Sequence, residues 1–391
     1  MSIEVRAAEV SRAFTNAEDK RVRRDFLEVV DGIYRDDPNY VRSLDLELKD
    51  RLSPSNPFFL HAEGVLFVAY RGGVPVGRCT AQIDHEHLAR HKDGAGFFGF
   101  LDTIDDPAVA KALLEAAEAW LRERGMERVR GPLSLSINEE TGCLIDGFTT
   151  PPMVMMPHHR SYQGGLIEAA GYKKTKDVYA WQYFPGDVPK RARQAADALA
   201  KLPEISVRPI DPKNIEADIR IGMDIFNDAW ADNWGFVPMT EPELKKMASD
   251  FKLILVPELT QIVSIDGKPA GICVCLPNLN EIVRDFGGKI TPVNLARLIW
   301  RFKVLGPSQA RVILLGIRRE YRHVRKYAAL SAFMYANVNE AGRKLHIRSA
   351  ELSWTLEDNG PVNAGIKLMG GKIYKTYRIY ERELARTSTA G

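Results

Sequence analysis

The sequence has few cysteines, and those it has follow no recognisable binding pattern. Only four of the 391 residues are cysteine, and their spacing fits no zinc site. Cys273 and Cys275 lie within an apolar pattern of strand type, where adjacent side chains point to opposite faces. No disulfide is expected at Cys79, Cys143, Cys273 or Cys275, which fits a reducing cytosol.

The chain also lacks any apolar run long enough to span a bilayer. Its first residues, MSIEVRAAEVSR, are charged and have no apolar core of the signal-peptide type. We therefore expect a cytoplasmic location, either free or peripheral at the inner membrane. The net charge of +3 is too small to indicate a nucleic-acid partner, and it allows only mild attraction to an anionic membrane or cofactor.

At 391 residues the chain is too long for one ordinary core, so two domains are expected. Its composition, 45% hydrophobic and 27% charged, is that of a globular protein. Two sequence matches indicate a tandem duplication. VAYRGGVPVGRC at 68–79 is matched by IVSIDGKPAGIC at 262–273, and AAGYKKTKDVYAW at 169–181 by LMGGKIYKTYRIY at 368–380.

Each half has the same predicted order of strand, helix, irregular helix, hairpin, strand, helix, strand, helix and strand. We predict an N-terminal domain at 1–187, a linker helix at 188–203 and a C-terminal domain at 204–391. Pro185, Pro189 and Pro203 flank the linker.

The segment from Arg311 to Tyr380 carries the clearest functional signal. An apolar strand at 312–317 is followed by a turn at 318–326 with five Lys or Arg, one His and one Glu, and then by a helix. Free backbone N–H groups and the helix dipole converge at such a turn, which suits an anion. The pattern indicates a ligand that bears a pyrophosphate.

This order of elements, in two copies, resembles the GNAT superfamily of acyl-CoA-dependent N-acyltransferases. The resemblance implies an α/β (α+β) fold of two tandem GNAT-like domains, each a mixed, mostly antiparallel sheet flanked by helices. It also implies that acyl-CoA lies beside a splayed strand at 312–317. Backbone N–H groups of Leu315–Ile317 would polarise the thioester, and Asn359 would bond the pantetheine arm.

One motif departs from the family. In its loop pattern Arg322 is in place, but Arg325 and Tyr327 occupy the glycine positions. Glycines permit close backbone approach, so a wider loop is expected here, with the side chains of Arg322, Arg325 and Lys326 holding phosphate. The N-terminal copy has Asp102, Asp105 and Asp106 instead. These carboxylates would repel phosphate, so that copy is expected to bind no CoA and to be structural or to carry the acceptor.

Three longer strings resemble the bacterial ceramide synthase-like branch: GPLSLSINEETGCLIDGFTTPPMVMMPHH, NDAWADNWGFVPMT and ELSWTLEDNGPVNAGIKLMGG. That resemblance implies transfer of a long-chain acyl group from acyl-CoA to the amine of a sphingoid base, 3-ketosphinganine or sphinganine, to form ceramide. Acyl-CoA would be the co-substrate and no metal would be needed. We expect the C-terminal copy to hold CoA and the amine to bind between the copies.

Amide formation needs a base for the ammonium proton. Adjacent Glu139 and Glu140 can raise each other's pKa, although they can also be ordinary loop carboxylates. His158 and His159 are further candidates, although a lone histidine is more often structural. Asn138 precedes the glutamates and is a candidate for binding the substrate.

Two segments are candidates for the substrate wall. The Pro-rich loop at 151–157 carries Met153 and Met155, which can adapt to an alkyl chain or pack in a core. The segment at 226–236 carries Trp230, Asn233 and Trp234, expected as a lid over the acceptor or as a cap on the core.

The family's tyrosine acid is missing, because Ile366 stands at its position. Tyr374 or Tyr377 can replace it, and Tyr377 is the candidate we include, although thiolate can also leave without an acid. Glu351 follows in the fifth strand. An extra helix is expected at 291–305, apolar on one face, with Arg297 and Arg301 at the margins of that face. The apolar face favours packing against the core, and contact with a membrane surface is the alternative.

Two other functions remain open. One is a tandem GNAT acetyl or aminoacyl transferase that acts on a polar amine. The other is a non-catalytic protein that binds acyl-CoA or lipid, which the altered glycine loop would allow.

Overall fold

The computed structural model describes residues 2–10, 14, 16–186 and 188–385. Its contacts group into two compact units. The first contains the chain up to Val178, Arg284–Leu295 and the chain from Lys375; the second contains Tyr179–Val283 and Ala296–Tyr374. The predicted boundaries at 188–203 and 204 stay a prediction, and residue 187 lies outside the described residues. The end of the chain groups with the first unit, which the sequence did not indicate.

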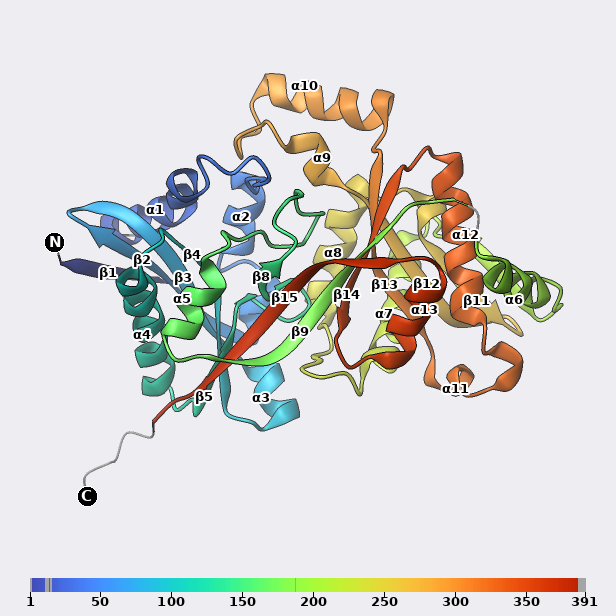
Figure 1. Cartoon of the computed structure of the whole chain (residues 1–391), viewed down its shortest axis with the longest axis horizontal. Helices are drawn as coiled ribbons and strands as arrows, with labels where there is room; N and C mark the ends of the chain where they lie inside the picture. The colour runs from blue at the N-terminus through green and yellow to red at the C-terminus, as the bar shows by residue number, and fades with distance from the viewer. Residues whose placement is uncertain (1, 11–13, 15, 187, 386–391) are drawn as a thin grey trace. The chain divides into compact units, whose positions relative to one another are not determined.

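The first unit is a mixed sheet flanked by helices (Figure 1). Its strands follow the order β1–β2–β3–β4–β5–β15, β8 also pairs with β15, and β4 and β5 are a parallel pair. The elements are β1 (Ile3–Glu9), α1 (Ala17–Ile33), α2 (Asp45–Arg51), β2 (Ala62–Arg71), β3 (Val74–Asp84), α3 (His85–His91), β4 (Ala95–Thr103), α4 (Pro107–Glu123), β5 (Arg128–Gly131), β6 (Leu133–Ser134), β7 (Glu140–Thr141), β8 (Cys143–Asp146), α5 (Gln163–Ala169), most of β9 (Lys173–Tyr183) and most of β15 (Lys372–Glu383).

The second unit repeats this plan. Its strands follow the order β14–β13–β12–β11–β10, and β13 and β14 are the parallel pair. The elements are α6 (Lys190–Ala200), β10 (Ile205–Pro209), α7 (Ile215–Trp230), α8 (Glu241–Ile254), β11 (Gln261–Ile265), β12 (Lys268–Pro277), α9 (Leu279–Val283), α10 (Pro292–Trp300, which begins in the first unit), a π-helical turn at Arg301–Leu305, β13 (Gln309–Ile317), α11 (Arg319–Arg322), α12 (Leu330–Lys344), β14 (Ser349–Leu356) and α13 (Gly360–Leu368). The predicted fold class is confirmed.

Local sequence signals explain where these elements begin. Asn16 caps α1, because its side chain accepts a hydrogen bond from the Asp19 N–H at 2.7 Å. Val22, Phe26 and Val30 recur at helical spacing on its buried face. The matched hairpins predicted from sequence are observed as β2–β3 and β11–β12. All four cysteines are buried and free, as expected.

Helices cover both faces of the second sheet. On one face α12 packs Leu330, Phe333 and Met334 against the strands. On the other, Ile225 of α7 contacts Ile262 and Ile272. The carboxyl-terminal half of β13 therefore lies between α12 and α7. We look for the ligand-binding site there. In the described part of the chain, no helix is both long and apolar enough to cross a membrane.

Candidate active site

The parallel pair of the second unit separates after Val312. β13 pairs with β14 only over Gln309–Val312, but it stays paired with β12 as far as Ile317. A bulge lies at the point of separation, because Cys275 pairs with Val312 and Val274 with Leu314. On the side of β13 that faces β14, residues 313–317 have no strand partner among the described residues. Their backbone groups, including those of the predicted residues Leu315 and Ile317, can bind an extended ligand.

A buried polar cluster lies where the two strands separate. Side chains alternate along a strand, so Arg311 and Glu351 point away from the face that α12 covers. The Nε of Arg311 donates to the Oγ of Ser353 at 2.8 Å and lies 3.5 Å from Oε1 of Glu351. Both the Ser353 hydroxyl and the Tyr374 hydroxyl donate to Glu351, whose side chain is fully buried. A carboxylate between two hydroxyl donors can move a proton.

Trp230 covers the separated part of β13. Its ring lies so close to Gly316 that a Cβ there would overlap it, and Phe226 packs against it at 5.0 Å between ring centroids. Trp230 is half-buried, and its role as a substrate wall or as a cap on the core stays a prediction. The Asn233 N–H donates to the Trp230 carbonyl at 2.8 Å in the turn that follows, and Trp234 next to it is half-buried. Glycine is needed at 316 because the indole takes the place of a side chain.

Arg322, predicted to bind phosphate, holds the polypeptide itself. Its Nε donates to the Ile317 carbonyl at 2.8 Å, and its Nη2 donates to the Ala229 carbonyl. Burial lowers the pKa of Arg322, while Asp228 opposes that change. Arg322 therefore ties the end of β13 to the end of α7.

Acidic residues meet most of the other cations of this turn. Arg319 donates its N–H to Asp228 at 2.7 Å and pairs with Asp232 at 3.0 Å, while Arg318 pairs with Asp224. These aspartates recur every four residues along and just after α7. The turn is thus less positive than its sequence suggested.

The side chains of two cations of the turn, Arg325 and Lys326, are exposed to solvent. Lys326 is paired with Glu204, which raises the pKa of the lysine. Arg325 is exposed and has no ion-pair partner in the part of the chain that the structure describes. Tyr327 is half-buried and meets Tyr321 edge-on at 5.8 Å, so it packs rather than opening the loop. Arg325 can therefore bind an anion without first breaking an ion pair with a described residue.

Asn359, the predicted pantetheine ligand, caps α13. Its side chain accepts a hydrogen bond from the Val362 N–H at 3.4 Å, and its backbone carbonyl accepts one from the Asn363 N–H. The cap explains why α13 begins directly after the β14 loop.

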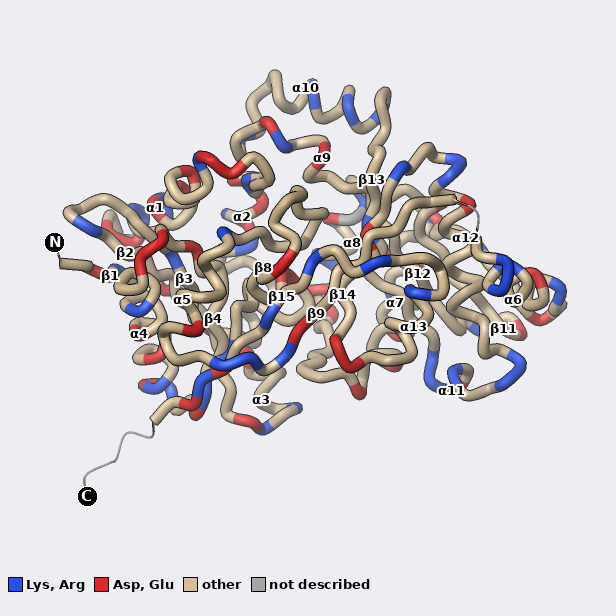
Figure 2. Tube along the Cα trace, viewed as in Figure 1, with Lys and Arg blue, Asp and Glu red and all other residues tan. Residues whose placement is uncertain are grey.

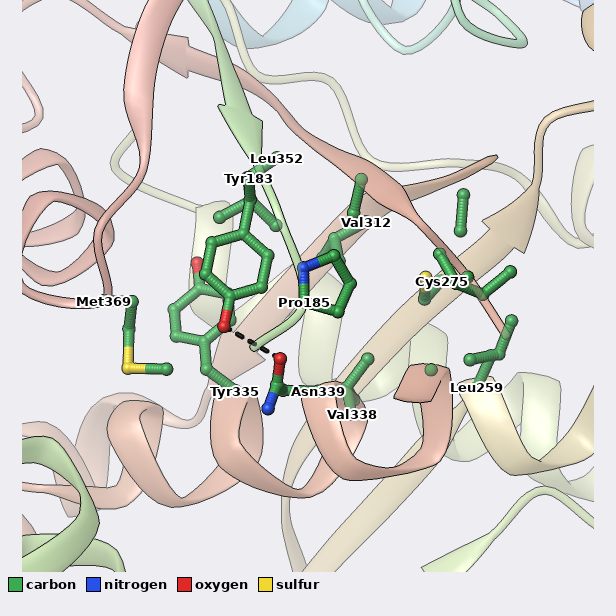
Figure 3. Close-up of a pocket in the computed structure, with 14 residues that line it drawn as sticks. Tyr183, Pro185, Leu259, Cys275, Val312, Tyr335, Val338, Asn339, Leu352 and Met369 are labelled. Carbon is green, nitrogen blue, oxygen red and sulfur yellow. Dashed lines mark hydrogen bonds between the residues drawn. The ribbon is translucent and has the colours of Figure 1, made fainter. Parts of the chain in front are cut away.

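An apolar cavity of about 30 Å³ lies under the point where β13 and β14 separate (Figure 3). Val312 and Leu352, the last paired residues, point into it with Cys275. The hydroxyl of Tyr183 donates a hydrogen bond to Oδ1 of Asn339 at 2.9 Å, so the part of Tyr183 that lines the cavity is its apolar ring. The remaining lining comes from α12, α13 and nearby chain: Pro185, Leu259, Ala310, Tyr335, Val338, Gly342, Ile347, Ala350 and Met369.

The equivalent space in the first unit is filled by the chain itself. β4 and β5 pair only over Ala95–Phe97 and Arg128–Arg130, and β4 also bulges. β6 then lies against β4 so closely that a Cβ at Gly99 would overlap the Leu133 carbonyl oxygen. This backbone contact leaves no room for a pantetheine arm. The predicted carboxylates also have partners: Asp102 binds Arg78 at 2.8 Å, and Asp106 binds Arg71.

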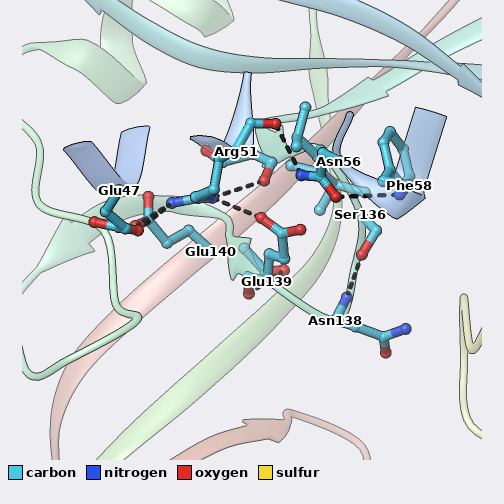
Figure 4. A network of polar contacts seen from close by, with 12 residues as sticks. Glu47, Arg51, Asn56, Phe58, Ser136, Asn138, Glu139 and Glu140 are labelled. Carbon is cyan, nitrogen blue, oxygen red and sulfur yellow. Dashed lines mark hydrogen bonds and ion pairs between the residues drawn. The ribbon is translucent and has the colours of Figure 1, made fainter. Parts of the chain in front are cut away.

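Glu139 and Glu140 share one guanidinium (Figure 4). Arg51 lies 2.7 Å from Glu139, 3.2 Å from Glu140 and 3.5 Å from Glu47, and it donates to the Ser134 carbonyl at 3.0 Å. Burial raises the pKa of Glu139, and the Arg51 charge opposes that rise. The mutual repulsion predicted from the sequence is therefore a smaller cause than burial. These contacts are those of an ion-pair network in which Arg51 is nearly buried and the carboxylates are partly exposed.

The two histidines have different surroundings. Nδ1 of His159 accepts the Leu144 N–H at 3.1 Å, and burial lowers the pKa of His159 to about 4. His158 holds its Nε2 2.9 Å from Asp37, so the proton between them lies on Nε2. Its Nδ1 is buried and has no hydrogen-bond partner among the described residues. Burial lowers the pKa of His158, and Asp37 opposes the change.

The other predicted residues of the first unit are mostly packed. Tyr377 is fully buried in β15, where it pairs with Leu144, so it lies in the first unit and Tyr374 in the second. Met153 is buried, and Met155 is half-buried with a φ of 59°. The Asn138 N–H donates to the Ser136 hydroxyl at 3.1 Å.

Sequence reasoning missed Arg51, Asp37 and Arg311. Each is the partner of a residue that was singled out, but none lies near that residue in sequence. The only local signal was at Arg311, which is a charged residue at the start of an apolar strand. Among the described residues no group of three or more His, Cys, Asp or Glu side chains could hold a metal ion, and the absence of a metal stays an expectation.

No protein-family model matches the chain. Similar proteins include the bacterial ceramide synthase of Caulobacter vibrioides (strain NA1000 / CB15N), 40% identical over 375 residues that cover 95% of this chain and 96% of that protein. Protein YghO of Escherichia coli (strain K12) is 38% identical over 378 residues, which cover 95% of each. A solved tandem GNAT protein from the clavulanic acid biosynthesis pathway aligns with a TM-score of 0.56 over 98% of this chain and 99% of that chain. Its 13% identity supports the fold alone.

The fold, with its separated parallel strands, is that of the tandem GNAT proteins. The chain belongs to the family that includes the bacterial ceramide synthase and protein YghO. It is an acyl-CoA-dependent N-acyltransferase, whose substrates are a CoA thioester and an amine.

Proposed function

We propose that the chain transfers a long-chain acyl group from acyl-CoA to the amine of a sphingoid base, 3-ketosphinganine or sphinganine, and so forms ceramide. The observation that carries the proposal is the 40% identity to a bacterial ceramide synthase over 95% of this chain. A lipid amine and a long acyl chain also suit the apolar lining next to the separated strands.

The acyl-CoA site of the proposal lies in the second unit. Backbone N–H groups along Leu315–Ile317 polarise the thioester carbonyl. Arg325 meets the pyrophosphate without losing a described partner, while Lys326 exchanges Glu204 for it. Arg322 holds the end of β13 in place for this geometry. Asn359 keeps the start of α13 beside the pantetheine arm.

The polar cluster supplies the proton steps. Glu351 takes a proton from the substrate ammonium, and the neutral amine nitrogen then bonds to the carbonyl carbon as the C–S bond breaks. Tyr374 gives its hydroxyl proton to the leaving thiolate and regains one from Glu351, to which it is hydrogen-bonded. Glu351, ionised again, accepts the second proton that the nitrogen loses as the amide forms and passes it to solvent. Arg311 holds the carboxylate in place, with its Nε 3.5 Å from Oε1 of Glu351.

The cavity receives the part of the acyl chain next to the thioester. As it stands the cavity is small, since about 10–15 Å³ of such volume already holds a single water. A longer chain requires its neighbours to move. Met369 on the wall is unbranched and flexible, which suits that movement.

The residues of the first unit that were predicted to bind the amine remain part of the proposal. Among these residues His158 is the best suited to accept a proton, because Asp37 orients it and its Nδ1 lone pair has no described partner. Asn138, Met153 and Met155 stand as candidate contacts for the lipid amine, and Glu139 and Glu140 as candidate bases. Trp230, Asn233 and Trp234 form the proposed wall in the second unit.

Thiol release from acyl-CoA tests the proposal. Purified protein should release free thiol from long-chain acyl-CoA only when sphinganine or 3-ketosphinganine is added. Equal release with a short polar amine such as spermidine would favour a transferase for polar amines. Binding of acyl-CoA without release for any amine in the panel would instead indicate a non-catalytic protein.

A further inference from the structure

The extra helix α10 and the π-helical turn after it present an apolar surface to solvent. None of their residues is buried, so the core-packing role favoured by the sequence is wrong. Six apolar side chains, which we call the α10 face, are between 46% and 68% exposed: Val293, Leu295, Ile299, Trp300, Val304 and Leu305. Such a contiguous exposed set marks an interaction surface.

Polar residues occupy the other side of this helix. The Asn294 side chain donates to the Lys289 carbonyl at 2.8 Å, and Arg301 donates to the Ile282 carbonyl at 2.6 Å. Leu298 and Phe302, nearer this side, are half-buried. Hydrogen bonds to backbone carbonyls thus anchor the helix, while much of its apolar surface points outward. That orientation is the reverse of an ordinary surface helix.

The charge of the segment has one sign. Between Asp285 and Gly306 the chain has no Asp or Glu and four Lys or Arg: Lys289, Arg297, Arg301 and Lys303. Figure 2 shows Lys and Arg along α10 and no acidic residue on it. Lys303 is exposed next to Val304, so a cation borders the apolar side chains. Trp300 adds a side chain that is favoured at the boundary between lipid and water.

We propose that the α10 face docks the enzyme on a bilayer with anionic headgroups. The apolar side chains enter the boundary of headgroups and acyl chains, and the exposed Lys303 lies at headgroup level. This complementarity of charge favours an anionic lipid surface over an apolar protein partner. The proposal deepens the proposed function, because a sphingoid base resides in a bilayer, but its test needs no substrate.

Vesicle binding tests the docking surface directly. The full chain is sedimented with vesicles of phosphatidylcholine alone and with vesicles of equal parts phosphatidylcholine and phosphatidylglycerol. The triple variant V293S/I299S/V304S should bind the mixed vesicles at least tenfold more weakly than the wild type. The matched control L46S/L60S/V74S also replaces exposed apolar side chains, and it should bind as the wild type does.

A separate variant tests the contribution of the Lys303 charge. Lys303→Gln should weaken binding to the mixed vesicles about fivefold and leave binding to phosphatidylcholine unchanged, since each Lys near an anionic surface contributes about 1 kcal/mol. Lys111→Gln, an exposed lysine on α4, is the matched control and should have no effect.

Several results would overturn the docking proposal. One is a wild type that binds neither kind of vesicle, and another is a triple variant that binds as tightly as its control. A wild-type dimer that the triple variant converts to a monomer, without vesicle binding, would assign the face to a second copy. Amide formation is measured separately with detergent-dispersed sphinganine, so loss of docking and failure of the proposed reaction give different results.

Discussion

Gly99 and Leu133 touch through their backbones, with the Leu133 carbonyl oxygen where a Cβ of residue 99 would be. This contact closes the space between β4 and β5. In the second unit the equivalent strand instead carries Gly316 under the ring of Trp230, and β13 keeps an edge without a strand partner in the described part. Two copies of one plan therefore differ in whether a thioester can lie between their central strands.

Gly99→Ala should destabilise the protein by roughly 1–3 kcal/mol, because the new methyl group must push β6 away from β4. Urea denaturation measures this difference in the free energy of unfolding. Gly165→Ala is the control, since nothing lies within 4 Å of a Cβ there and alanine favours a helix. A Gly99→Ala protein as stable as the control would contradict the close backbone contact.

Glu351→Gln should lower kcat/KM at least about 100-fold, because the amide cannot take the ammonium proton. Tyr374→Phe should lower kcat more modestly, about tenfold, because a thiolate can leave unaided. Glu115→Gln, an exposed residue of α4, is the control and should retain full activity.

The same assay tests Glu139 as an alternative to Glu351. If Glu139→Gln lost as much activity as Glu351→Gln and kept its thermal midpoint, the base would lie in the first unit instead. Arg51 would then be a positioning residue for Glu139 rather than the centre of a structural network.

Ala350→Leu should shorten the longest acyl-CoA that is used efficiently, because the added methyl groups project into the cavity. The measurement is kcat/KM across acyl chain lengths. Gly342→Ala, which adds one methyl group to the same lining, should shift the preference less. An unchanged preference in Ala350→Leu would show that the acyl chain lies elsewhere.

His159 should make the fold sensitive to acid. Its pKa is about 4 when folded and 6.5 ordinarily, so between these values the unfolded chain binds more protons and stability falls as pH decreases. From pH 7.5 to 5.0 this one group should cost about 2 kcal/mol of unfolding free energy. His159→Asn keeps an acceptor for the Leu144 N–H and should lose correspondingly less over that range.

Regular elements were predictable because their signals are local. Asp106 caps the first turn of α4 (Pro107–Glu123), because its side chain accepts a hydrogen bond from the Ala108 N–H. The strand predicted at 312–317 is the separated half of β13, and the helix at 291–305 is observed as α10 and its π-helical turn. The order of elements then indicated the fold through its resemblance to a family.

Partners remote in sequence could not be predicted. Arg51 reaches Glu140 across 89 residues, and Asp37 reaches His158 across 121. Sequence showed the cations of the turn at 318–326 but not the aspartates of α7 that meet them. It also gave no sign that Leu133 closes the first copy, since a close approach of two backbones depends on tertiary packing.

The most direct test of the account is the mass of the product. Protein incubated with deuterated palmitoyl-CoA and sphinganine should yield deuterated N-acylsphinganine, and Glu351→Gln should yield at least about 100-fold less. N,N-Dimethylsphinganine has no proton on its neutral amine to give up and should yield no amide. Thiol release without an N-acyl product, or equal product from a short polar amine, would contradict the assignment as a sphingoid-base N-acyltransferase.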